Sequence, residues 1–159
     1  DLSYNLLKSV PDNSFLGLKR LKTLRLDHNM ISKKLTGNAL KDLRSLENLF
    51  LSDNFIPSID EKLLMESPRL AELYLQNNSI KVLPSKIFSK NQRIQKIYLG
   101  FNSIKIVPLE VFTSTFSWIK WVDLQYNNLP AEEIQKLKAY FASKEIQFSV
   151  DPQKSPDLL

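Results

Sequence analysis

The chain has 159 residues, with 22 Lys and Arg, 17 Asp and Glu, no Cys, and 27 Leu. This length suits one domain, because roughly 100–200 residues per domain is usual, and 43% hydrophobic with 25% charged residues is globular composition. Without Cys there is no disulfide framework or thiol nucleophile, and a lone His28 excludes a histidine metal cluster. No apolar run approaches the roughly 18 residues of a membrane span. We therefore expect no metal, no cofactor, no membrane span and no enzymatic activity.

An asparagine recurs along the chain at a nearly constant spacing. Successive copies are 24, 25, 24, 24 and 25 residues apart, and each lies three positions after an aliphatic residue in an L-x-L step. Five complete copies, LKTLRLDHNMI, LENLFLSDNFI, LAELYLQNNSI, IQKIYLGFNSI and IKWVDLQYNNL, fit L-x-x-L-x-L-x-x-N-x-L with Ile or Val in place of some Leu. The asparagines are Asn5, Asn29, Asn54, Asn78, Asn102 and Asn127.

These copies predict the order of elements along the chain. Residues 1–20 form a partial first repeat, and repeats that begin near residues 21, 46, 70, 94 and 119 follow as far as 129. Each L-x-L step predicts a short strand with one buried face, and stacking the copies builds a continuous core. We expect the asparagines to form a ladder, because each side-chain amide can satisfy backbone groups where the strand ends and the chain turns.

The second half of each repeat is expected to lie outside the sheet. One position is shared by the copies there and is filled by Phe15, Leu40, Leu64, Phe88 and Phe112. Three copies carry a proline, which favours a turn and discourages a long helix, at Pro11, Pro84 and Pro108. The proline-free copies GNALKDLRS and DEKLLMESP are expected to form short helical turns capped by Asn38 and Asp60.

The pattern changes after Leu129. Residues 130–150 are expected to form a cap, in which PAEEIQKLKAYFASKE makes a helix that begins after Pro130 and IQFSV makes a last strand. Residues 151–159 are expected to be a loose tail. Because the first repeat has no comparable cap, we expect the chain to be part of a longer array.

The two motifs, L-x-x-L-x-L-x-x-N-x-L and x-L-P-x-x-x-F-x-x-L, resemble those of the leucine-rich repeat family, from Asp1 to about Leu129. The 24-residue period resembles the "typical" repeats of secreted and cell-surface members of that family. This resemblance implies an α/β fold: a right-handed, curved solenoid with a parallel β-sheet on its concave face and irregular or short helical segments on its convex side. It also implies an extracellular location.

Outward side chains of successive strands should form columns on the concave face, which is where we expect a partner to bind. Large aromatic rings anchor protein interfaces well. The expected partner-binding residues are Arg25, Phe50, Tyr74, Tyr98, Phe101, Trp121, Asp123 and Tyr126. An alternative for the three rings at positions 50, 74 and 98 is a structural ladder, since neighbouring aromatics also stabilise a sheet.

The function that the resemblance implies is non-enzymatic recognition of another protein, in a receptor, in cell adhesion, in the matrix or in innate immunity. The alternatives are a self-associating structural scaffold and an intracellular regulatory scaffold. The net charge of +5 does not indicate a nucleic-acid partner, because the basic excess lies away from the strands. A polyanionic glycan is a lesser alternative. Asn77 lies in a glycosylation acceptor pattern, Asn77-Asn78-Ser79.

Overall fold

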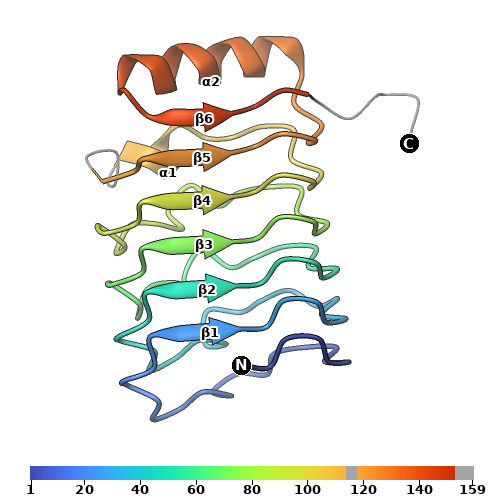
Figure 1. Ribbon diagram of the computed structural model, residues 1–159, viewed down its shortest axis with the longest axis vertical. Helices are drawn as coiled ribbons and strands as arrows, with labels where there is room; N and C mark the ends of the chain where they lie inside the picture. Colours follow the sequence, from blue (N-terminus) through green and yellow to red (C-terminus); the bar gives the residue numbers. More distant parts are fainter. Residues whose placement is uncertain (114–117, 153–159) are drawn as a thin grey trace.

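The computed structural model describes residues 1–113 and 118–152, in which six short strands form one parallel sheet in chain order. The strands lie one above another from β1 to β6 (Figure 1). Their bounds are β1 Thr23–Arg25, β2 Asn48–Phe50, β3 Glu72–Tyr74, β4 Lys96–Tyr98, β5 Trp121–Asp123 and β6 Gln147–Ser149. This open sheet, with few helices, confirms the predicted α/β solenoid.

The core lies between the sheet and the outer segments of the repeats. The central residue of each strand points inward in exact register with its neighbours, as Leu24 does with Leu49 and Leu73 with Ile97. Phe88 and Phe112, from the outer segments, are fully buried against this layer. The inward position of each strand is thus filled by one aliphatic or aromatic side chain per repeat, which is the arrangement that stacked copies require.

The outer segments consist mostly of consecutive turns. The proline-free copies form turns with hydrogen bonds between residues three apart, such as Lys41 N–H to the Asn38 carbonyl at 3.3 Å, and Asp60 Oδ1 accepts the Lys62 N–H at 2.9 Å. In the described outer segments the one α-helix is α1, Glu110–Thr113, and it lies in a copy that carries a proline. Pro108 is compatible with this helix because it lies two residues before Glu110, where no helical N–H is needed, and its carbonyl accepts the Val111 N–H at 3.1 Å.

Beyond the last complete repeat, helix α2, Ala131–Ser143, lies over the β6 end of the stack (Figure 1). Leu137 and Phe141 are fully buried, and the Phe141 ring meets Phe112 edge-on at 5.2 Å between centroids. Strand β6 pairs with β5 and completes the sheet. Of the expected tail, residues 153–159 lie outside the described residues. None of the described helices has the length and apolar character that crossing a membrane needs.

Candidate recognition surface on the sheet

The recurrent asparagines connect each repeat to the one before it. Asn54 is 5% exposed; its Oδ1 accepts the Ile31 N–H at 3.0 Å, and its Nδ2 donates to the Leu26 carbonyl at 3.0 Å. The same two contacts recur at Asn29, Asn78, Asn102 and Asn127. Asn5, by contrast, is exposed and its Nδ2 donates only to nearby carbonyls of its own segment. The ladder therefore fixes the point at which each strand turns inward.

The residue before each asparagine has a left-handed backbone. These residues are Tyr4, His28, Asp53, Asn77, Phe101 and Tyr126, with φ between 53° and 56°. Asn, Asp and His tolerate this region comparatively well, whereas bulky aromatic residues rarely adopt it. The sequence analysis named Asn77, Phe101 and Tyr126 from this column but did not predict its left-handed backbone, although the constant place before the ladder asparagine marks it. The column forms one rim of the outward sheet surface, which we call the strand face.

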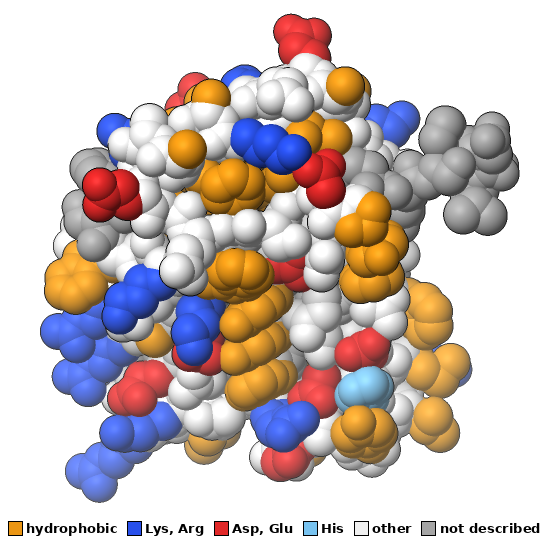
Figure 2. All heavy atoms as spheres, turned by 45° about the horizontal axis from the view of Figure 1, so that its top comes forward, with side chains coloured by type: hydrophobic (Ala, Val, Ile, Leu, Met, Phe, Trp, Pro, Cys, Tyr) orange, Lys and Arg blue, Asp and Glu red, His pale blue; other side chains and the backbone are white. Residues whose placement is uncertain are grey.

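Three aromatic rings stack on the strand face. Phe50 and Tyr74 have ring centroids 4.4 Å apart at an interplanar angle of 9°, and Tyr74 and Tyr98 are 4.6 Å apart at 7°. Figure 2 shows hydrophobic side chains in a continuous column on this face. The stack follows from strand register, because Phe50 pairs with Tyr74 and Tyr74 with Tyr98. We call these three residues the ring stack.

Arg25 covers the first ring of the stack. Its Cζ atom lies 5.0 Å from the Phe50 ring centroid, within the range of a cation–π interaction. The same guanidinium donates from Nε to Asp27 Oδ1 at 3.1 Å and from Nη2 to Asp27 Oδ2 at 2.9 Å. Asp27 is buried beneath the Arg25 guanidinium. The Arg25 side chain thus covers a carboxylate that follows β1 on the outward surface.

Charged groups beside the ring stack are paired. Lys96 Nζ lies 2.9 Å from Glu72 Oε1, and the Tyr74 hydroxyl donates to Glu72 Oε2. The Lys96 ammonium and, after it, the Tyr74 hydroxyl lower the pKa of Glu72. Burial, together with the adjacent carboxylate, raises the pKa of Tyr74. The column next to the rings is therefore held in one geometry by charge-assisted hydrogen bonds.

The rim column contributes two further ring pairs. Tyr4 stacks on His28 at 4.2 Å and Phe101 on Tyr126 at 4.3 Å between ring centroids. Between them, Asp53 accepts a hydrogen bond from Asn77 Nδ2 at 2.6 Å and lies 3.5 Å from His28 Nε2. The predicted residues Phe101 and Tyr126 thus lie together, on a different column from the ring stack.

The remaining predicted residues, Trp121 and Asp123, begin and end β5. Trp121 is half-buried and, in the described part of the chain, makes no ring–ring contact. Asp123 is 9% exposed, its Oδ1 accepts the Gln125 N–H at 3.1 Å, and burial raises its pKa. The sequence placed this carboxylate on the outward surface but gave no sign that it is buried there.

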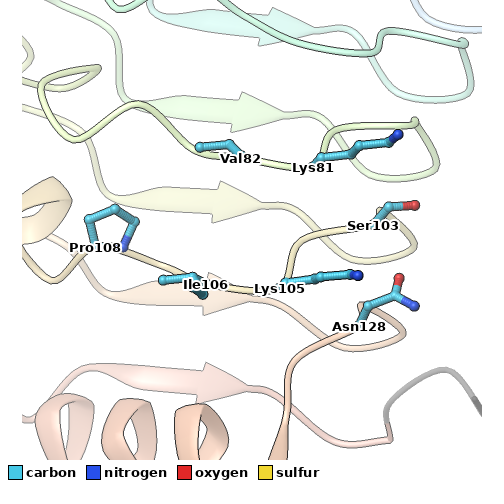
Figure 3. Close-up of a pocket in the computed structure, with 7 residues that line it drawn as sticks. All are labelled: Lys81, Val82, Ser103, Lys105, Ile106, Pro108 and Asn128. Carbon is cyan, nitrogen blue, oxygen red and sulfur yellow. The ribbon is translucent and has the colours of Figure 1, made fainter.

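A cavity of about 570 Å³ lies on the segments that follow the strands, away from the ring stack (Figure 3). It is lined by Lys81, Val82, Ser103, Lys105, Ile106, Pro108 and Asn128. Val82 and Ile106 are 65% and 61% exposed. None of the predicted partner-binding residues lines it. Among residues 1–113 and 118–152, no three His, Asp or Glu side chains gather in a metal-binding group.

The repeat pattern also matches a known family. The family model described as "Leucine rich repeat" matches residues 1–56 and 68–129. The chain belongs to the leucine-rich repeat family. No curated protein matches it. Leucine-rich repeats are typically non-enzymatic protein-interaction modules, and on that basis this leucine-rich repeat chain is an interaction module.

Proposed function

We propose that this leucine-rich repeat chain recognises a protein partner through its strand face, as part of a secreted or cell-surface protein. The observation that supports the proposal is the ring stack with its neighbours. Phe50, Tyr74 and Tyr98 are all half-buried, so each presents part of its ring at the surface of a rigid sheet. Aromatic rings bury much area on binding while losing little conformational entropy.

Pre-organisation of the stack favours this use. The ring centroids already lie 4.4 and 4.6 Å apart, and carboxylates hold Arg25 at the Phe50 end and Lys96 in the adjacent column. A partner that docks on them has few side chains to order, and ordering a rotamer-rich side chain costs about 0.5–1.5 kcal/mol. The same stacking also stabilises the sheet, by about 0.2–1 kcal/mol for each neighbouring pair. The two roles make different predictions when the rings are removed.

The test compares two variants with the native chain. Phe50→Ala, Tyr74→Ala and Tyr98→Ala together remove the ring stack, and Val82→Ala with Ile106→Ala removes exposed apolar groups elsewhere. Proteins of the extracellular fluid are captured on each immobilised variant and quantified. We expect at least one protein to bind the native chain and the control pair equally, and to be lost from the triple variant.

If the triple variant captures the same proteins as the native chain but has a much lower melting temperature, the ring stack is structural instead. Sedimentation velocity at several concentrations tests the self-associating scaffold, which predicts a concentration-dependent increase in sedimentation coefficient that the triple variant lacks. Roles in adhesion, matrix organisation or innate immune recognition belong to the same proposal and depend on the partner that is captured.

The extracellular location is proposed from the 24-residue class of repeat. Asn77 offers a direct measurement, since its side chain is exposed at the rim of the strand face and lies in an acceptor pattern. Intact mass of the chain from a secreting host should show a glycan that disappears in Ser79→Ala. An unmodified mass, with the chain retained inside the cells, would favour the intracellular scaffold.

A further inference from the structure

The column that holds the ring stack changes character abruptly at one end. From β1 to β6 the register places Arg25, Phe50, Tyr74, Tyr98, Asp123 and Ser149 side by side. Arg25 covers the Phe50 end. At the other end Tyr98 is followed by the shorter side chains of Asp123 and Ser149, so the surface is lower there. We call this change in height the step.

The Tyr98 ring is half-buried and ends the ring stack at this step. Tyr74 stacks on one side of the ring, and no other described ring or cation packs on Tyr98. Trp121, also on β5, lies in the adjacent column, where its register partner is Lys96. Because neighbouring strands are about 4.8 Å apart, the space above Asp123 has the depth of one stacked planar group.

Asp123 forms the floor of this step, and it is buried without a cationic partner among the described residues. Asp53 lies 3.5 Å from His28 Nε2, and Asp27, Glu47 and Glu72 each have a Lys or Arg partner within 4.0 Å. Asp123 has none in the described chain, although nine-tenths of it is buried. A buried carboxylate without a counter-charge is unfavourable.

Two further features shape the floor. A Cβ atom at Gly100 would lie 2.7 Å from Asp123 Oδ2, so only glycine leaves the carboxylate its present position. Gln76 occupies the equivalent place one repeat earlier, since the Asn77 N–H donates to the Gly100 carbonyl. Its Oε1 is buried and has no hydrogen-bond partner among the described residues. Within the described chain, a carboxylate without a cationic partner and an amide oxygen without a donor therefore lie on either side of β4, at this end of the ring stack.

We propose that the step beside Tyr98 receives an arginine side chain of the protein partner, with its guanidinium stacked on the Tyr98 ring and paired with Asp123. This inference rests on the proposed function and names the chemistry of the partner. The arrangement repeats what the chain already does at the opposite end, where Arg25 covers Phe50 and pairs with Asp27 through two hydrogen bonds. A planar guanidinium fits both tasks, whereas a lysine ammonium cannot form a two-point pair or stack.

The test uses a small probe, so it needs no identified partner. Nα-acetylarginine amide is titrated into the native chain, and the NMR signals of the Tyr98 ring and the Trp121 indole are followed. Nα-acetylcitrulline amide, which has nearly the same shape but no charge, is the matched control ligand. We expect saturable shifts with the arginine probe and at least about tenfold weaker binding of the citrulline probe. Equal shifts with both probes would overturn the inference.

Two variants make the test specific. Asp123→Asn should abolish the saturable shifts while the spectrum stays that of a folded chain. Asp53→Asn is the matched control, because it removes a carboxylate that already has its partners, and it should bind the arginine probe like the native chain. Unchanged binding by Asp123→Asn would refute the site. If the probe fails while a captured protein still depends on the ring stack, the inference fails alone; if the probe binds but no partner needs the stack, the proposed function fails alone.

Discussion

Replacing one ladder asparagine should destabilise the chain far more than replacing another at the same place in the repeat. Asn54→Ala removes the acceptor of the Ile31 N–H and the donor to the Leu26 carbonyl, both in the preceding repeat. Asn5→Ala is the matched control. Asn5 carries the same motif position, yet it is exposed and its amide donates only to Leu2 and Ser3.

The expected magnitude follows from what each substitution leaves unpaired. In Asn54→Ala the Ile31 N–H loses its buried acceptor, which costs about 1–3 kcal/mol, and the Leu26 carbonyl keeps Asn29 Nδ2 at 3.0 Å but loses one hydrogen bond, which is worth about 0.5–1.5 kcal/mol. The loss of unfolding free energy should therefore be about 1.5–4.5 kcal/mol, or roughly 3–18 °C in melting temperature for a chain of this size. In Asn5→Ala water replaces the lost contacts, so a change within about 0.5 kcal/mol is expected.

Urea unfolding followed by circular dichroism gives both free energies, and amide hydrogen exchange shows where the loss occurs. The Ile31 amide should exchange faster in Asn54→Ala by the factor that corresponds to the lost bond, while amides of β4 and β5 should change least. A cost for Asn54→Ala no larger than for Asn5→Ala would show that the ladder amides do not carry inter-repeat stability. Asn54→Asp, which keeps an acceptor but places a buried carboxylate against the Leu26, Leu51 and Ser52 carbonyls, should destabilise the chain at least as much as Asn54→Ala.

Three further measurements test other contacts. Glu133→Ala should lower the unfolding free energy by about 1–3 kcal/mol, because the Val107 N–H, 2.8 Å from Glu133 Oε1, loses its buried acceptor; exchange of that amide is the readout. Since the pKa of Tyr74 is raised in the folded chain, its stabilising contribution is complete below about pH 10 and is lost as the pH rises through that raised value. Tyr74→Phe should therefore flatten the alkaline fall in melting temperature and remove the last phenol to ionise in ultraviolet titration. The pKa of Asp123 is also raised, chiefly by burial, so its carboxylate opposes folding at neutral pH, and Asp123→Asn should raise the melting temperature. In each of the three measurements, a change of the opposite sign would contradict the contact or the burial from which the prediction was made.

Periodicity was sufficient to predict the fold, because each repeat uses the same few positions for the same task. The L-x-L steps became β1 to β5, and the recurrent asparagines lie where each strand ends. The family match confirms the type of repeat. Patterns that repeat five times average out local irregularities, which is why these strands were predictable even though each has only three residues.

Features that occur once or twice were not predictable in this way. Ser67 and Asn91 are fully buried at a position where Leu43 lies one repeat earlier, and Asn91 Nδ2 donates to the Ser67 carbonyl at 2.7 Å. Glu133, which reads as a solvated first-turn residue of a helix, instead accepts a buried N–H from the preceding repeat. In each case a polar side chain meets a backbone group that only the stacked structure brings near it, so the repeat pattern carries no signal for it.

The composition of one column bears on whether the ring stack serves the fold or a partner. At the same register position the solenoid accommodates Arg25, Asp123 and Ser149 as well as the rings, so the backbone does not require an aromatic residue there. A ladder that served stability alone would gain from continuing into β5, since each added ring pair contributes about 0.2–1 kcal/mol. The stack instead ends at a carboxylate that is buried without a counter-charge, which lowers stability. A group that opposes folding at the edge of an exposed aromatic surface is better explained by what the surface binds than by what holds it together.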